Sequence, residues 1–163
     1  MYQYSFANVD LIIEMDYPSN TNPSSFKVEG YGAGENLITV NRRAPIADTK
    51  FSAYGDMVVS MQRIRAGDLA FPVLMNAKEN KYLQDYANYF QAQADANGEL
   101  IVPLQAKLRD NMGKDVANMS NGVILAMPGM TRGLTMNLVT WVITFETVVY
   151  ERNHGADLDN LSS

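Results

Sequence analysis

The C-terminal part of the chain contains a run of alternating residues that fits an extended strand of unusual length. Between residues 136 and 150, one set of alternate positions holds large apolar side chains: Val139, Trp141, Ile143, Phe145 and Val149. The other set is semi-apolar and rich in β-branched residues: Leu138, Thr140, Val142, Thr144, Glu146 and Val148. A strand over these residues would extend about 50 Å, well beyond an ordinary strand. Two largely apolar faces favour a protein that buries the second face in an assembly.

Two-residue periodicity recurs over much of the chain and predicts a mainly β protein. Near the N-terminus, apolar and acidic positions alternate: Val9, Leu11, Ile13 and Met15 against Asp10, Glu14 and Asp16. Further strands are predicted at residues 26–31, 37–42, 51–65 with a bend at Gly55, 69–75, 100–109, 115–119 and 123–127. The sequence AGD at residues 66–68 predicts a hairpin turn that pairs the strand ending at residue 65 with the strand at 69–75. Residues 43–50 are predicted to be a connection, because their periodicity is weak.

One helix is predicted, at about residues 77–94. Asn76 can cap its N-terminus, and Glu79 follows three residues later, as in a capping box. The helix has an apolar stripe at Leu83, Tyr86, Ala87 and Phe90. The predicted fold is therefore an antiparallel β-sandwich or barrel with one flanking α-helix. It forms a single domain over residues 1–163, with a short polar tail at about 153–163.

The composition argues against several classes of protein. The net charge of −5 makes the chain a poor nucleic-acid binder, since phosphate neutralisation needs clustered Lys and Arg. There are no cysteines, so neither a disulfide framework nor a thiolate metal site is expected. The N-terminal residues lack a signal-peptide pattern, and no apolar run has the ~18 residues of a membrane-spanning helix. These observations predict a soluble protein made in a cytoplasm.

The glycine-rich sequence EGYGAGENLITV, residues 29–40, is the first candidate for a ligand site. Its glycines are spaced G-x-G-x-G and an apolar strand pattern follows them. A dinucleotide fingerprint needs G-x-G-x-x-G followed by a helix, whose N-terminus meets the pyrophosphate. A bulge or hairpin between strands is therefore predicted here, and no cofactor site.

Other catalytic and metal-binding patterns are also missing from the sequence. The single histidine, His154, lies in the polar tail. Asp10 and Glu14 would be ~13 Å apart along a strand, too far for the paired carboxylates of a glycosidase. The sequence DLDN at residues 157–160 lacks the glycine and glutamate of a calcium loop. We therefore predict no catalytic residue, no cofactor and no metal, and a protein that is not an enzyme.

The order of features along the chain resembles the tail tube proteins of bacteriophages with contractile tails. The resemblance lies in YSFANVDLII, then GYGAGENLITVNRR, then AYGDMVVSMQRIRAGDLAFPVLMNAKENKYL, and it covers about residues 4–149. Each motif alone is weak, and their order is the more specific signal. The chain departs from the family pattern at AYGD, where a Gly-Ala-Asp-Gly turn would be more usual.

The resemblance implies a structural virion protein, synthesised in the host bacterial cytoplasm. Six copies would form a ring in which inner strands join across subunits, and stacked rings would form the inner tail tube. DNA would pass through the lumen without specific binding. The implied partners are sheath, tape-measure, baseplate and terminator proteins, and no membrane insertion is expected.

Two groups of contact residues are predicted within such a tube. The long connection at residues 42–54 would reach between stacked rings or subunits, with Arg42, Arg43, Asp48, Lys50 and Phe51 as contact candidates. A solvent-exposed loop is the alternative reading of this segment. The candidate lumen or surface acids are Asp10, Glu14, Asp16 and Glu146.

Two other functions remain open from the sequence. One is a carbohydrate- or protein-binding β-sandwich module of a phage fibre or baseplate. The other is a hydrolase that uses carboxylates, which is disfavoured because the sequence assembles neither a close acid pair nor a histidine-containing triad.

Overall fold

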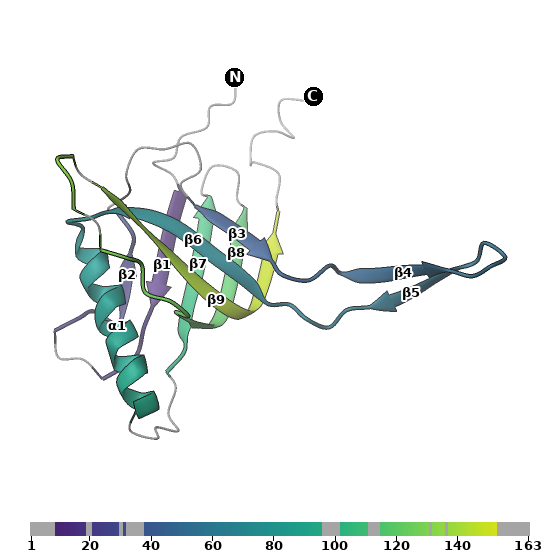
Figure 1. The fold of residues 1–163 in the computed structure, drawn as a ribbon, viewed down its shortest axis with the longest axis horizontal. Coiled ribbons are helices and arrows are strands. Elements are labelled where there is room, and N and C mark those ends of the chain that lie inside the picture. Colours follow the sequence, from purple (N-terminus) through teal and green to yellow (C-terminus); the bar gives the residue numbers. More distant parts are fainter. Residues whose placement is uncertain are drawn as a thin grey trace, which may run out of the picture.

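The computed structural model of the chain describes residues 9–18, 21–29, 31, 38–95, 102–110, 115–130, 132–135 and 137–152. Ten elements follow one another along it: β1 Val9–Glu14, β2 Ser25–Lys27, β3 Thr39–Arg42, β4 Ala47–Phe51, β5 Met57–Met61, β6 Gly67–Leu74, α1 Lys78–Asp95, β7 Leu104–Asp110, β8 Val116–Val123 and β9 Leu138–Glu151. Seven strands form one antiparallel sheet in the order β2-β1-β7-β8-β9-β6-β3, while β4 and β5 form a separate hairpin (Figure 1). The predicted mainly β, antiparallel fold with one helix is confirmed. The described sheet is open, with β2 and β3 at its two ends.

The hydrophobic core lies between the curled sheet and α1. Alternate side chains of the central strands are fully buried, as the two-residue periodicity predicts, among them Leu11, Ile13, Leu69, Phe71, Trp141 and Ile143. Leu83 and Tyr86 of α1 pack into the same core. The Tyr86 hydroxyl donates a hydrogen bond to the Val102 carbonyl at 2.7 Å, which ties the helix to the segment that leads into β7. The helix begins one residue after the predicted start and ends one residue after the predicted end.

The long C-terminal strand is confirmed as β9, which pairs with two different strands along its length. The first part of β9 pairs with β6, the second part pairs with β8, and Phe145 lies opposite both Gly67 and Gly122. The alternation changes phase after Phe145: Val148 is buried and Val149 is exposed, so the predicted faces of these two residues were wrong. The change occurs where β9 leaves β6, and there the Val148 N–H donates to the Arg65 carbonyl at 2.8 Å.

The hairpin pairing predicted from AGD was wrong. The β5 strand pairs with β4, over Ala47–Phe51, which was predicted to lie largely in a connection. The turn between them contains Gly55 at φ 89°, a backbone conformation that glycine adopts without strain. The β6 strand instead pairs with β3 and β9. Two-residue periodicity gives the faces of a strand but does not identify its partner, which explains the error.

Two predicted strands after the helix merge into one. The predicted strands at 115–119 and 123–127 are replaced by β8, and residues 124–127 lie outside any strand. Asn121 has a positive φ of 56° inside β8. Such a residue marks an irregularity of the strand, and a register shift occurs across from it in β7, between Leu104 and Ala106.

The glycine-rich segment is described only at its ends, because Gly30 and residues 32–37 lie outside the described residues. The Glu29 N–H donates to Oε1 of Glu79 at 3.0 Å. Glu79, which was predicted to take part in a capping box, is thus buried against the segment that follows β2. His154, residues 97–98 and residues 157–160 also lie outside the described part of the chain.

Candidate assembly surfaces

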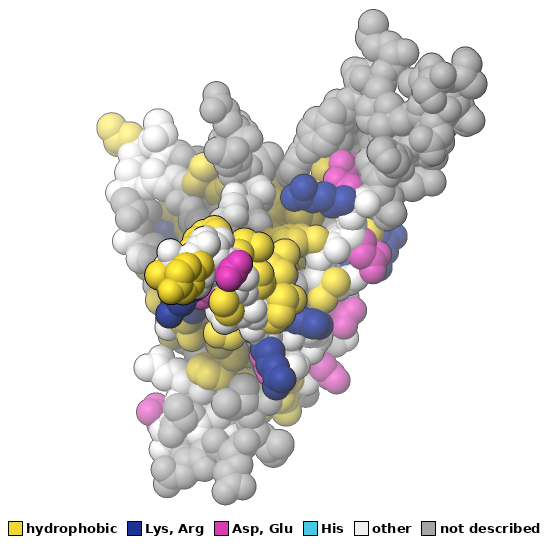
Figure 2. All heavy atoms as spheres, turned by 90° about the vertical axis from the view of Figure 1, so that its right-hand side faces the viewer, with side chains coloured by type: hydrophobic (Ala, Val, Ile, Leu, Met, Phe, Trp, Pro, Cys, Tyr) yellow, Lys and Arg dark blue, Asp and Glu magenta, His cyan; other side chains and the backbone are white. Residues whose placement is uncertain are grey.

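A two-stranded hairpin projects from the body of the protein. We define the arm as residues 46–64, which contain β4 and β5 and pair only with each other (Figure 1). Eight apolar side chains of the arm are between 47% and 96% exposed: Ile46, Phe51, Tyr54, Met57, Val58, Val59, Met61 and Ile64. Figure 2, which views the molecule from the end that carries the arm, shows these hydrophobic side chains gathered at the front. Large apolar side chains exposed together in this way are typical of a protein–protein contact.

Side-chain hydrogen bonds within the arm stabilise its turn and link its two sides. The Ser52 hydroxyl accepts hydrogen bonds from the backbone N–H groups of Tyr54 and Asp56, at 3.3 and 3.1 Å. The side chain of Gln62 donates to Asp48 across the two strands, at 3.1 Å. These local bonds specify a hairpin, although an isolated two-stranded hairpin has only marginal stability in water.

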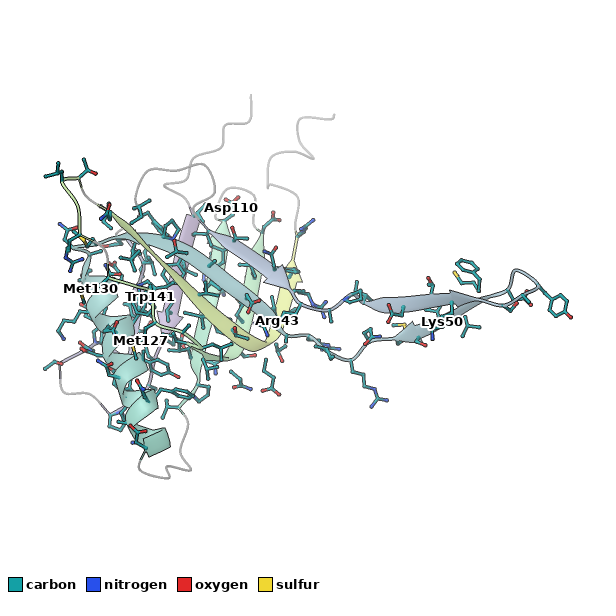
Figure 3. All side chains as sticks on the ribbon, viewed as in Figure 1. Arg43, Lys50, Asp110, Met127, Met130 and Trp141 are labelled. Carbon is teal, nitrogen blue, oxygen red and sulfur yellow. The ribbon has the colours of Figure 1, made fainter. Side chains whose placement is uncertain are left out.

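The predicted contact residues lie on the arm or at its base. Asp48, Lys50 and Phe51 are exposed on β4, and Lys50 lies well away from the body in Figure 3. Arg42 ends β3 and donates from Nη2 to the Ile64 carbonyl, at 3.3 Å. The apolar residues of β5 were not predicted as contacts, because the sequence MVVSM resembles a buried strand as closely as it resembles an exposed one.

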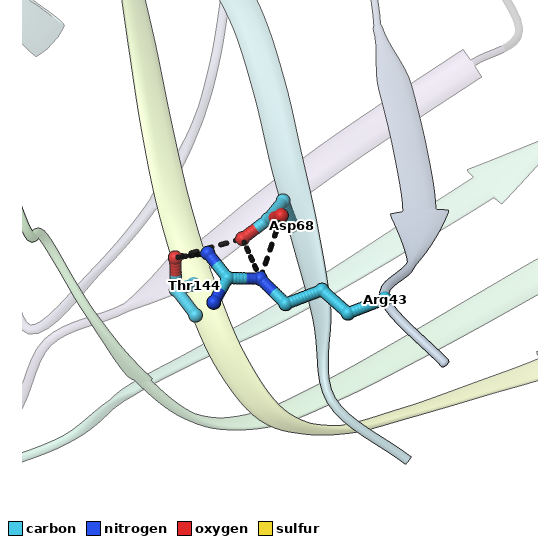
Figure 4. Close-up of polar contacts among 3 residues, drawn as sticks. All are labelled: Arg43, Asp68 and Thr144. Atoms are coloured by element: carbon cyan, nitrogen blue, oxygen red, sulfur yellow. Dashed lines mark hydrogen bonds and ion pairs between the residues drawn. The ribbon is translucent and has the colours of Figure 1, made fainter. Parts of the chain in front are cut away.

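Arg43 makes a three-residue contact at the base of the arm, which we call the Arg43 clamp (Arg43, Asp68 and Thr144; Figure 4). Its Nε donates to both carboxylate oxygens of Asp68, at 3.1 and 2.9 Å, and its Nη2 donates to the Thr144 hydroxyl at 3.3 Å. The Thr144 hydroxyl in turn donates to Oδ1 of Asp68 at 2.8 Å. The hydrogen bond from Arg43 is the main reason that the pKa of Asp68 is lowered. The same bond raises the pKa of Arg43.

A second candidate surface is the face of the sheet that points away from the core. The predicted acids Asp10, Glu14 and Glu146 lie on this open face, and Asp16 is exposed just beyond β1. Asp10 forms an ion pair with Lys27 at 2.8 Å, and this hydrogen bond raises the pKa of Lys27. Glu146 accepts a hydrogen bond from Asn121 at 3.0 Å.

Basic residues share the open face with these acids. Lys107 lies opposite Ile12 in the register of β1 and β7, and Arg109 lies opposite Asp10. A hollow of about 310 Å³ on this face is bordered by Glu14, Lys107 and Asn118, among other residues. The open face therefore carries charges of both signs.

A second group of exposed hydrophobic residues lies in the connection between β8 and β9: Leu125, Met127, Met130 and Leu134. The Gln84 amide of α1 contacts the Met127 sulfur at 2.9 Å, which places the connection beside the helix. Met127 and Met130 lie at the opposite end of the molecule from the arm (Figure 3).

Among the described residues, no group of three or more His, Cys, Asp or Glu side chains is placed to hold a metal ion. The one described helix is not apolar enough over its length to cross a membrane.

Comparisons with known proteins find solved structures with a similar fold. No protein-family model matches the chain, and no curated protein matches it in sequence. A chain from the sheath–tube complex of an extracellular contractile injection system (PVC) in its extended state is similar, with a TM-score of 0.53 and 10% identity over 93% of each chain.

A chain from the sheath/tube terminator of the same kind of system, also extended, has a TM-score of 0.52 and 11% identity. The match covers 93% of this chain and 98% of that one. The resemblance predicted from the sequence is thus confirmed for the fold, which is similar to that of these two chains of contractile injection systems.

Proposed function

We propose that the protein is a structural subunit that assembles with its own copies into the inner tube of a contractile phage tail or a related injection particle. Six copies would form each ring, and the rings would stack into the tube. The observation that carries the proposal is the arm, a paired hairpin that extends from the body with apolar side chains exposed on it. The structural likeness to chains of a sheath–tube complex and a tube terminator supports the same function.

The arm fits a contact with a neighbouring subunit. Fully burying an apolar side chain such as Phe51 or Met57 contributes about 1.5–3 kcal/mol, from which the cost of association is subtracted. The arm offers eight exposed apolar side chains and has no described partner in its own chain besides its base. A contact between the arm of one copy and the body of the next uses two different surfaces, and such a contact builds rings or tubes.

The open sheet supports ring formation in a second way. The edge strands β2 and β3 end the described sheet, and unpaired edges attract further strands. Joining these edges across subunits would cover them in a closed ring. The open face, with Asp10, Glu14 and Glu146, would line the lumen. Its mixed charges would let DNA pass without specific binding, since specific grip on phosphates needs clustered cations.

A subunit of the inner tube would also contact the other proteins of the tail. A sheath would surround the tube, a tape-measure protein would occupy the lumen during assembly, and terminator and baseplate proteins would bind its ends. The subunit would be made in the bacterial cytoplasm and would function in the virion, without enzymatic activity.

Assembly of the purified protein tests the proposal. Negative-stain microscopy and sedimentation should find hexameric rings or tubes for the unmodified chain. The double variant Phe51→Ser/Val58→Ser removes apolar surface from the arm and should shorten or abolish the tubes. Both residues are exposed, so the folded subunit should persist.

The matched control is Thr49→Ala/Ser60→Ala, a double substitution at exposed positions of the same two strands that leaves the apolar side chains of the arm in place. This control should still form tubes. A monodisperse monomer at high concentration would contradict the proposal. Binding to a glycan array without ring formation would instead favour a fibre or baseplate module.

A further inference from the structure

The arm is attached to the body by two short segments, which are bonded to each other, and the returning one is also bonded to β9. On the entering side, the Arg43 N–H donates to the Ala66 carbonyl at 2.9 Å. On the returning side, the Arg65 carbonyl accepts from the Val148 N–H of β9 at 2.8 Å. Between these bonds and the tip, the strands of the arm pair only with each other. The direction of the arm is therefore decided at its base.

The Arg43 clamp lies at this base and joins three segments that are distant in sequence. Asp68 of β6 and Thr144 of β9 are direct partners in the register of these two strands. The guanidinium of Arg43 contacts both members of the pair, with Nε on the carboxylate and Nη2 on the hydroxyl. A planar group held at two different nitrogens has a fixed orientation, unlike the single point charge of a lysine.

Folding stability alone does not explain this arrangement. The side chains of Arg43 and Asp68 are 50% and 31% exposed, and ion pairs at exposed positions contribute little to the free energy of unfolding. The clamp adjoins the segment whose backbone sets where the arm points. A side chain fixed there limits the angles that the arm can adopt.

We propose that Arg43 is a positioning residue, which holds the arm at one angle to the body through Asp68 and Thr144 so that a second copy of the chain meets it in a fixed orientation. This inference rests on the proposed function for the identity of the partner. The orientation of the arm itself can be measured in a single subunit. Holding a binding segment in its bound geometry improves association because less freedom is lost on binding.

The chain has no cysteine, so two spin labels can be placed without removing native thiols. One label replaces Tyr54 at the tip of the arm, and the other replaces Asn88 on the exposed side of α1. Pulsed electron resonance then gives the distribution of distances between the two labels. The sample is diluted until sedimentation shows single subunits, or is diluted with unlabelled protein.

The test variants are Arg43→Gln, Asp68→Asn and Thr144→Val, each in the labelled chain. Arg43→Gln and Asp68→Asn should widen the distance distribution at least about twofold, and Thr144→Val should widen it less, since it removes the weaker contact. The control is Lys81→Gln, which removes an exposed ion pair of equal length, 2.9 Å to Asp85, on the helix. It should leave the distribution unchanged.

Assembly provides the second readout. Arg43→Gln should raise the concentration needed for tube formation about tenfold, the change that a modest loss of preorganisation produces. The fluorescence of Trp141, the only tryptophan, should be unchanged in these variants if the body remains folded.

The outcomes separate the two proposals. An unchanged distance distribution in Arg43→Gln would overturn the positioning role even if the unmodified chain forms tubes. If the unmodified chain forms no tubes, the proposed function fails, while the distance measurement still decides what the clamp does. A distribution that widens without any change in assembly would overturn the link between arm angle and association.

Discussion

The ring of Phe145 occupies the space that a side chain on Gly122 would need. A Cβ atom built on Gly122 would lie 2.4 Å from Cε1 of Phe145, closer than any real contact. The two residues are opposite each other in β8 and β9, at the point where β9 also pairs with Gly67 of β6. Glycine therefore allows a large aromatic ring to fill the core where three strands meet.

Replacing Gly122 with alanine should destabilise the subunit by roughly 1–3 kcal/mol, because the added methyl group overpacks a buried site. Denaturant unfolding at a concentration that keeps subunits separate would measure the change. Gly129→Ala is the control, since a Cβ there meets nothing within 4 Å. Equal stability of the two variants would show that the Phe145 ring moves aside at little cost.

The side chain of Asn80 joins the helix to two strands. Its Oδ1 accepts from Nε1 of the buried Trp141 at 2.8 Å, and its Nδ2 donates to the carbonyls of Leu74 and Met75. Asn80→Leu should cost about 1–3 kcal/mol, because it leaves a buried indole N–H without an acceptor.

The Trp141 emission spectrum should shift in the same variant, since the indole changes its environment. Asn88→Leu, on the exposed side of the same helix, serves as the control and should change neither property. If Asn80→Leu unfolds at the same denaturant concentration as the unmodified chain, the hydrogen bonds of Asn80 make no net contribution to the free energy of unfolding.

Acid should loosen the base of the arm. The pKa of Asp68 is lowered in the folded protein, so its carboxylate stabilises the clamp above the ordinary aspartate pKa of about 3.9, and this contribution is lost as pH falls through the lowered value. The distance distribution between arm and helix should therefore stay narrow at neutral pH and widen only below about pH 4.

The pKa of Asp85 is also lowered, first by its hydrogen bond with Asn22 and then by Lys81, so some loss of global stability is expected in the same range. Asp68→Asn separates the two effects, because its distribution should already be wide at neutral pH. A pH response that is identical in this variant and in the unmodified chain would assign the acid effect to groups other than Asp68.

The sequence predicts those parts of the fold that depend on local patterns. The helix is correct within one residue because its cap and apolar stripe lie within a few turns of each other. The buried positions of β1 and the first part of β9 follow from alternation. The pairing of β5 with β4 is not predicted, since exposed Met57 and Val58 have the composition of a core strand.

The Arg43 clamp could not be predicted from the sequence either. Arg43 stands out as a charge in a long connection, but its partners are 25 and 101 residues away. They come together only through the register of Asp68 with Thr144, which depends on the whole sheet. The contact roles between subunits that are predicted for Arg42, Arg43, Asp48, Lys50 and Phe51, and the lumen or surface role of the acids, remain predictions.

The place of β9 in the sheet has a consequence for the timing of folding. In the described part of the chain, one half of the sheet, β2-β1-β7-β8, is joined to the other half, β6-β3, through this strand, which follows the other eight described strands in sequence. Thr144, which completes the clamp, arrives with it. Until β9 has paired on both sides, neither the complete described sheet nor the Arg43 clamp can form, so the last step of sheet formation also completes the clamp.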